Sequence, residues 1–168
     1  GVVASDVAGV GTARFNIAAS GYGSDKAIFG YGSVASPGLS MTNLVSNVGV
    51  VATDTSGVGT ARRELAAASY GGDKAIFGYG VISTQSSLTN LVSSSGVVSA
   101  DVTGVGTART ASAAASYGGD KALFGYGSTG SVSSLTNLVS NSGVVATDTT
   151  GVGTARNNLT AAGYSQSA

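Results

Sequence analysis

The stretch YGGDKAIFGYG, from Tyr70 to Gly80, occurs three times in this chain. It returns from Tyr117 to Gly127 with Leu in place of Ile, and a third version, YGSDKAIFGYG, occupies Tyr22 to Gly32. The motif GVGTAR keeps the same spacing and ends at Arg14, Arg62, Arg109 and Arg156, in steps of 48, 47 and 47 residues. A regular period of this length indicates a repeat architecture built from one supersecondary unit.

These motifs divide the chain into three full units and part of a fourth. We predict one repeat domain over residues 1–168, with units 1–48, 49–95, 96–142 and a partial unit 143–168. After Tyr164 the sequence YSQSA replaces YGGDKA, and we interpret this break as the C-terminal end of the array.

The composition excludes several classes of function. The 168 residues are 42% hydrophobic but only 10% charged, with zero formal net charge, whereas nucleic-acid binding needs a basic surface. His and Cys are absent, which removes the commonest general base and the usual soft metal ligands. No apolar run is long enough to cross a bilayer. We therefore expect no enzyme activity, no cofactor, no metal, no nucleic-acid partner and no membrane insertion.

Each unit contains four short segments with strand character, separated by Gly-rich and Ser-rich turns. In the second unit we predict strands over residues 65–70, 74–80, 87–93 and 96–101. Alternation along the second of these strands places Ala75, Phe77 and Tyr79 on one face.

Four strands in about 47 residues match the size of one blade of a β-propeller. We predict an all-β, propeller-like array of four-stranded antiparallel blades, with about 3.5 repeats. The Ala-rich first strand suits the crowded axis, and the larger apolar residues fill the space between blades. A β-solenoid with two coils in each unit remains the alternative.

The order of motifs within one unit resembles a kelch repeat. Arg62 precedes LAAASYGGDKAIFGYG, and LTNLVS and GVV follow after a variable loop. The chain departs from the kelch pattern because it has no Trp, and GYG stands where a double Gly usually ends the second strand. The array is also similar to repeats in structural proteins of marine tailed phages. That resemblance implies a virion-surface or tail-fibre module outside the cell, with adhesion to host-surface glycans.

Fourteen of the sixteen charged residues recur at fixed positions in the repeats. We interpret them as structural: the Asp of each TD turn, which includes Asp6, caps its own loop, and the Arg eight residues later pairs with this Asp or a neighbouring blade's Asp. The Asp-Lys pair ends a Gly71-Gly72-Asp73 hairpin turn and begins the next strand. The alternative is a ring of repeated ligand or ion sites. The structural set is Asp54, Arg62, Asp73, Lys74, Asp101, Arg109, Asp120 and Lys121.

The units disagree mainly in the loop after GYG, over residues 33–40, 81–87 and 128–134, and again just after the motif Arg. In an up-and-down blade both variable segments lie at one end, opposite the Gly-Gly-Asp turns. We expect that end to contact a partner, and sequence drift in tolerant loops is the alternative. The candidate binding residues are Ser33, Val34, Ser36, Pro37, Val81, Ser83, Gln85, Ser128, Thr129 and Ser131.

Two further expectations concern partners. A lectin-like protein with one shallow sugar site per blade is the alternative function, with repeated Tyr stacking on sugar rings, although Tyr31, Tyr79 and Tyr126 fit better between blades. An incomplete fourth unit leaves strand edges unpaired. We therefore expect other protein chains, either copies of this one or a larger assembly, to complete the structure.

Overall fold

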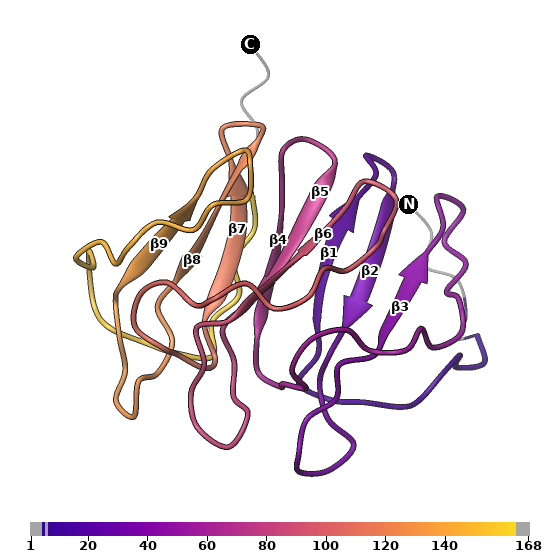
Figure 1. The fold of residues 1–168 in the computed structure, drawn as a ribbon, viewed down its shortest axis with the longest axis horizontal. Helices are drawn as coiled ribbons and strands as arrows, with labels where there is room; N and C mark the ends of the chain where they lie inside the picture. The colour runs from indigo at the N-terminus through magenta and orange to yellow at the C-terminus, as the bar shows by residue number, and fades with distance from the viewer. Residues whose placement is uncertain (1–4, 6, 164–168) are drawn as a thin grey trace.

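The computed structural model describes residue 5 and residues 7–163. Over these residues the chain is all-β, with nine strands in three antiparallel sheets and one sheet from each full repeat (Figure 1). The described residues contain no helix that is long and apolar enough to cross a bilayer.

Each sheet is a meander in which consecutive strands pair. The first sheet contains β1 (Ala18–Tyr22), β2 (Lys26–Gly30) and β3 (Thr42–Val45). The second contains β4 (Ala66–Tyr70), β5 (Lys74–Gly78) and β6 (Thr89–Val92). The third contains β7 (Ala113–Tyr117), β8 (Lys121–Gly125) and β9 (Thr136–Val139). Because every sheet is antiparallel and drawn from one repeat, the solenoid alternative is wrong.

The predicted fourth strand does not form, and each sheet has three strands rather than four. Segment 96–101 lies beside β6 and forms one isolated bridge, Val98 to Val92, and Val102 just after it forms a second, to Thr89. The Asn90 side chain explains the interruption, because its Nδ2 donates to the Ser99 carbonyl at 3.1 Å. A side-chain amide thus replaces part of the backbone ladder.

The Gly-Gly-Asp hairpin turn is confirmed. Tyr70 pairs with Lys74, and Gly71 and Gly72 take φ values of +62° and +79°, which favour glycine. The Lys74 ammonium lies 2.9 Å from the carboxylate of Asp73. Neighbouring turns are also joined, because the Gly71 amide donates to the Asp120 carbonyl at 2.7 Å.

The core lies between the sheets. Strands β1, β4 and β7 are neighbours, and one apolar cluster fills each of the two spaces between sheets. Ala75 and Phe77 point toward the first sheet, whereas Ile76 and Tyr79 point toward the third. The prediction that Tyr79 shares a face with Phe77 is therefore wrong. Tyr79 has a φ of +64°, and this left-handed residue just after β5 reverses the alternation.

Glycines at the ends of β2 and β5 allow the sheets to approach each other. A Cβ at Gly30 would lie 2.7 Å from the Phe77 ring, and a Cβ at Gly78 would lie 2.6 Å from the Phe124 ring. These rings therefore pack directly on the backbone of the preceding sheet, and they stand 5.2 Å from Tyr31 and 5.0 Å from Tyr79 between centroids.

We expect Gly78→Ala to lower the free energy of unfolding by about 1–3 kcal/mol, because the new methyl group overpacks the Phe124 ring. Gly125→Ala is the matched control, since its Cβ meets only the Thr136 side chain at 3.3 Å and a Leu123 methyl at 3.6 Å. Urea unfolding followed by circular dichroism measures both variants. Equal losses in the two variants would contradict the packing described here.

Candidate functional site

The motif Arg side chains lie between neighbouring sheets. The Arg62 side chain has no exposed surface, its Nη2 donates to Asn90 Oδ1, and its Nη1 lies 3.4 Å from Asp101 Oδ1. Its guanidinium carbon is 5.0 Å from the centre of the Tyr31 ring in the preceding sheet. Arg62 thus contacts amide and carboxylate oxygens on its own sheet and an aromatic face on the neighbouring sheet.

The same arrangement recurs at the next junction. Arg109 is also fully buried and donates to Asn137 Oδ1 at 2.6 Å. It lies 3.4 Å from the carboxylate of Asp148 and 4.6 Å from the centre of the Tyr79 ring. Repetition of this geometry supports a structural role for the motif Arg.

The turn Asp has a different partner from the one predicted. Asp101 accepts hydrogen bonds from the backbone amide and hydroxyl of Thr60, at 3.0 and 2.7 Å, rather than capping its own loop. Its charge partner is Arg62, which precedes it by 39 residues, so the motif Arg pairs with the Asp of the next unit. Asp54 and Asp148 are held in the same way by Thr12 and Thr107. Asp6 lies outside the described residues.

Burial and hydrogen bonds shift the pKa values of these groups. Partial burial alone would raise the pKa of the Asp101 carboxyl, but hydrogen bonds from Thr60 and Asn90 and the charge of Arg62 outweigh it and lower this pKa. Burial raises the pKa of Tyr31 and Tyr79 to about 12. Both Tyr side chains are fully buried, so they are closed to a sugar ring.

In the part of the chain that the structure describes, the repeated charges pair locally rather than gathering into an ion site. Lys26, Lys74 and Lys121 pair with the adjacent Asp at 2.7–2.9 Å. Within residue 5 and residues 7–163, no three Asp or Glu side chains come together as metal ligands. The geometry therefore favours the structural interpretation over a ring of ion sites.

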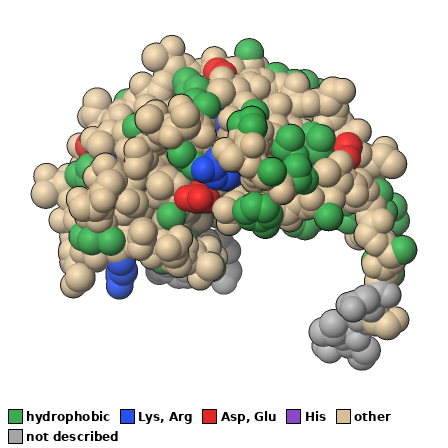
Figure 2. Space-filling view, turned by 90° about the horizontal axis from the view of Figure 1, so that it is seen from below, with side chains coloured by type: hydrophobic (Ala, Val, Ile, Leu, Met, Phe, Trp, Pro, Cys, Tyr) green, Lys and Arg blue, Asp and Glu red, His purple; other side chains and the backbone are tan. Residues whose placement is uncertain are grey.

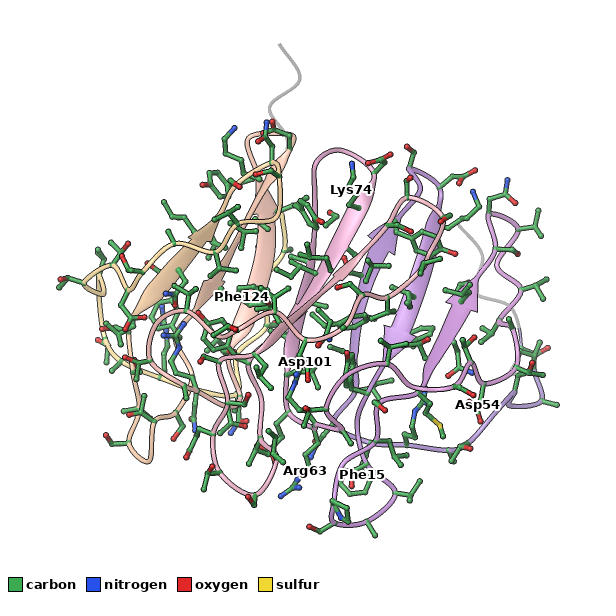
Figure 3. All side chains as sticks on the ribbon, viewed as in Figure 1. Phe15, Asp54, Arg63, Lys74, Asp101 and Phe124 are labelled. Atoms are coloured by element: carbon green, nitrogen blue, oxygen red, sulfur yellow. The ribbon has the colours of Figure 1, made fainter. Side chains whose placement is uncertain are left out.

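The two variable segments of each unit lie side by side. Backbone bridges join Phe15 to Ser33, Arg63 to Val81, and Thr110 to Ser128. Figure 3 shows Phe15 and Arg63 at the end of the molecule opposite Lys74, which marks the hairpin turns. We call this end, formed by residues 15–17, 63–65, 110–112 and loops 33–40, 81–87 and 128–134, the variable-loop face.

The predicted binding residues separate into loop tips and loop bases. Exposed tip residues are Val34, Ser36, Pro37, Ser83, Thr129 and Ser131. Val81, Gln85 and Ser128 are half-buried at the bases, and Ser33 is 1% exposed. Three of the base residues bond through the backbone to the segment after the motif Arg: Ser33 to Phe15, Val81 to Arg63 and Ser128 to Thr110. The tips therefore offer the most exposed side chains to a partner.

Sequence reasoning did not single out Phe15. Its side chain is 55% exposed on the variable-loop face and stands beside Ser33 and near Val34, which is 53% exposed. The signal was its place in the variable segment after the motif Arg, where the other units carry Arg63, Thr110 and Asn157. An exposed aromatic ring next to a hydroxyl-rich loop is an apolar surface for a ligand.

The rest of this face is mainly uncharged. Figure 2, which looks onto this end, shows few charged side chains among neutral ones. The pair Arg63 and Glu64, 3.8 Å apart, is not repeated in the other units. Glu64 also accepts a hydrogen bond from Thr110 at 2.8 Å, which links two units across this face.

The scan against protein-family models gives no match. The search of the curated proteins gives no significant match either.

We expect Arg109→Ala to lower the free energy of unfolding by about 3 kcal/mol or more, because it leaves Asn137 and Asp148 without their buried partner. Arg156→Ala is the matched control: Arg156 stacks on Tyr126 at 4.8 Å but is exposed. Urea denaturation compares the two, and a neutral Arg109→Ala would contradict the structural role of this Arg.

Acid should weaken the same contacts. Because the pKa of Asp101 is lower in the folded state than its ordinary 3.8, the unfolded state binds more protons at low pH. The stability contributed by Asp101 is present above pH 3.8 and is lost as the pH falls through 3.8 toward the lowered value. Asp101→Asn should be less stable at pH 6 and lose less stability between pH 5 and pH 3. Parallel pH profiles of the unfolding midpoint for the two proteins would contradict this.

Proposed function

We propose that this chain is a non-enzymatic structural and adhesive repeat module that presents the variable-loop face to a partner outside the cell. The observation that carries this proposal is the division of the molecule into two parts. The repeated residues pair with one another inside the frame, whereas the residues that differ between units are collected at one end. Rigid scaffolds with variable loops at one end are a common way to build a binding surface.

We further propose a propeller-like construction. The neighbouring strands β1, β4 and β7 take the inner position. The segment beside β3, β6 or β9 takes the outer, fourth position of each blade, because it keeps backbone bonds such as Ser99 to Leu91 at 2.8 Å. This construction agrees with the resemblance to kelch repeats.

The chemistry of the loops favours a neutral, hydroxyl-bearing ligand. Loops 33–40, 81–87 and 128–134 contain no charged residue and are rich in Ser and Thr. Hydroxyl groups both donate and accept hydrogen bonds, which suits sugars. Phe15 adds an exposed ring for the apolar face of a sugar. We propose cell-surface glycans as the partner, and the resemblance to phage proteins supports a virion-surface or tail-fibre location.

A loop-replacement experiment tests the proposal. The tips at residues 34–37, 82–84 and 129–131 are replaced by Gly-Ser sequences of equal length, while the bases that bond to the frame are kept. Wild type is expected to bind a subset of glycans on a glycan array, and the triple-loop variant is expected to lose that binding. Phe15→Ala alone should weaken binding, because the ring is exposed and contributes contact area.

The control alters the opposite end of the molecule. Lys26, Lys74 and Lys121 are changed together to Gln in the hairpin turns, and this variant should bind as wild type does. Equal glycan binding by wild type and the triple-loop variant, or no glycan binding by wild type, would overturn the proposal.

A further inference from the structure

The two outer faces of the array carry the residues that are buried at its internal junctions. The face of the first sheet turned away from the second carries Arg14, Phe29 and Gly49, and we call it the head face. The face of the third sheet turned away from the second carries Gly125, Tyr126 and Leu138, and we call it the tail face. Each internal junction contains the same three kinds of contact. For each kind, the equivalent of one partner lies on the head face and the equivalent of the other partner lies on the tail face.

The first contact is the ring that packs on glycine. Phe77 packs on Gly30, and Phe124 packs on Gly78. Phe77 and Phe124 have no exposed surface, whereas Phe29 on the head face is half-buried. Gly125 on the tail face is buried, but no aromatic ring of the described residues lies within 4 Å of its Cβ position.

The second contact is a socket for Tyr. Arg62 covers the Tyr31 ring, and the Tyr31 hydroxyl donates to the Val58 carbonyl at 3.2 Å. Arg109 and the Val105 carbonyl hold Tyr79 in the same way. The head face has the same parts in Arg14 and Val10, beside a cavity of about 520 Å³ that both residues line together with Phe29.

The Arg14 guanidinium already has the polar partners that Arg62 and Arg109 have at the internal junctions. It donates to Asn43 Oδ1 and lies 3.6 Å from the carboxylate of Asp54, and its side chain is 4% exposed. No Tyr ring of the described residues covers it, and its Nη1 has no hydrogen-bond partner among them.

The third contact is the glycine of the GVV motif. A Cβ at Gly96 would lie 3.0 Å from both Tyr22 and Leu44 in the preceding sheet, and Gly143 meets Tyr70 and Leu91 in the same way. Gly49 on the head face has no atom of the described part of the chain within 4 Å of its Cβ position. Leu138, the tail-face equivalent of Leu44 and Leu91, is 45% exposed.

We propose that the head face of one copy binds the tail face of a second copy. Phe29 then packs on Gly125, Arg14 covers Tyr126, and Gly49 receives Leu138. The two surfaces differ, so the contact is heterologous and extends into a filament or closes into a ring. The proposal does not depend on what the variable-loop face binds.

The chain's own C-terminal part competes for one region of the tail face. Residues 150–163 lie against the third sheet, where the Val152 carbonyl accepts the Tyr126 hydroxyl at 3.1 Å and Gly163 contacts Ser116. Residues 9–14 and 151–156 have the same sequence, GVGTAR, so the incoming head face offers an equivalent segment.

The incoming Arg is better supported than the one it displaces. Arg156 is exposed, and its side chain makes one hydrogen bond within the described residues, to the Tyr126 hydroxyl at 3.4 Å. Arg14 arrives with Asn43 and Asp54 already in place. The incoming sheet also brings Phe29, for which residues 150–163 have no equivalent.

Sedimentation velocity of the full chain over a wide range of concentration tests this proposal. Wild type is expected to form oligomers whose mass increases with concentration. Phe29→Asp on the head face and Leu138→Asp on the tail face should each be monomeric, since each retains only one working face. An equimolar mixture of the two variants should form a dimer and nothing larger, because one intact head and one intact tail remain.

A second head variant guards against loss of folding. Asn tolerates the φ of +80° at Gly49, and a Cβ there meets no atom of the described residues within 4 Å. In the proposed contact the Asn side chain of a Gly49→Asn variant would collide with Leu138 of a second copy. This variant should keep the melting temperature of wild type and lose self-association. Monomeric wild type at every concentration, oligomers of either single Asp variant, or a mixture that stays monomeric would each overturn the proposal.

Discussion

The structure depends on a guanidinium group buried between two sheets. A buried charge is costly unless oxygen atoms and a polarisable surface replace water around it. Arg62 obtains the oxygens from Asn90 and Asp101 on its own sheet, and it obtains the aromatic face from Tyr31 on the preceding one. No single repeat unit supplies both, so the Arg ties each sheet to its neighbour. This dependence between neighbours is what makes a repeat array fold as one body.

The same constraint explains which residues vary. The Gly-Gly-Asp turns are bonded to the next unit, as Gly23 is to Asp73. The buried Arg side chains contact residues of two sheets, as Arg109 does with the Tyr79 ring of the preceding sheet. The loops after GYG bond to the neighbouring segments mainly at their bases, as Val81 does to Arg63 and Ser128 to Thr110. The sequence differences between units therefore lie mainly in exposed loop tips. The residues that differ little between units are those that contact a neighbouring sheet, and the residues of the variable-loop face are those that differ.

Much of this organisation was predicted from local patterns. The spacing of the motifs predicts the repetition, three of the four strands form in each full repeat, and the hairpin at Gly71 is as expected. Local pattern failed where a side chain competes with the backbone or changes its direction. Asn90 takes the place of ladder bonds and interrupts the fourth strand, and the left-handed φ of Tyr79 turns its ring to the other face. Neither effect leaves a trace in the alternation of apolar and polar residues.

The amino-acid sequence by itself determined the repeat, the turns, and the recurrence of the charges at fixed positions, because each of these can be seen in short stretches of the chain. Only the tertiary structure decided the partner of each charge, since Arg62 and Asp101 are 39 residues apart and meet through the folding of a whole sheet. It also decided which loop residues are accessible, burying Ser33 and exposing Phe15. The reason is that burial and long-range pairing are set by how sheets pack on one another, and the packing follows from side chains that no local window contains together.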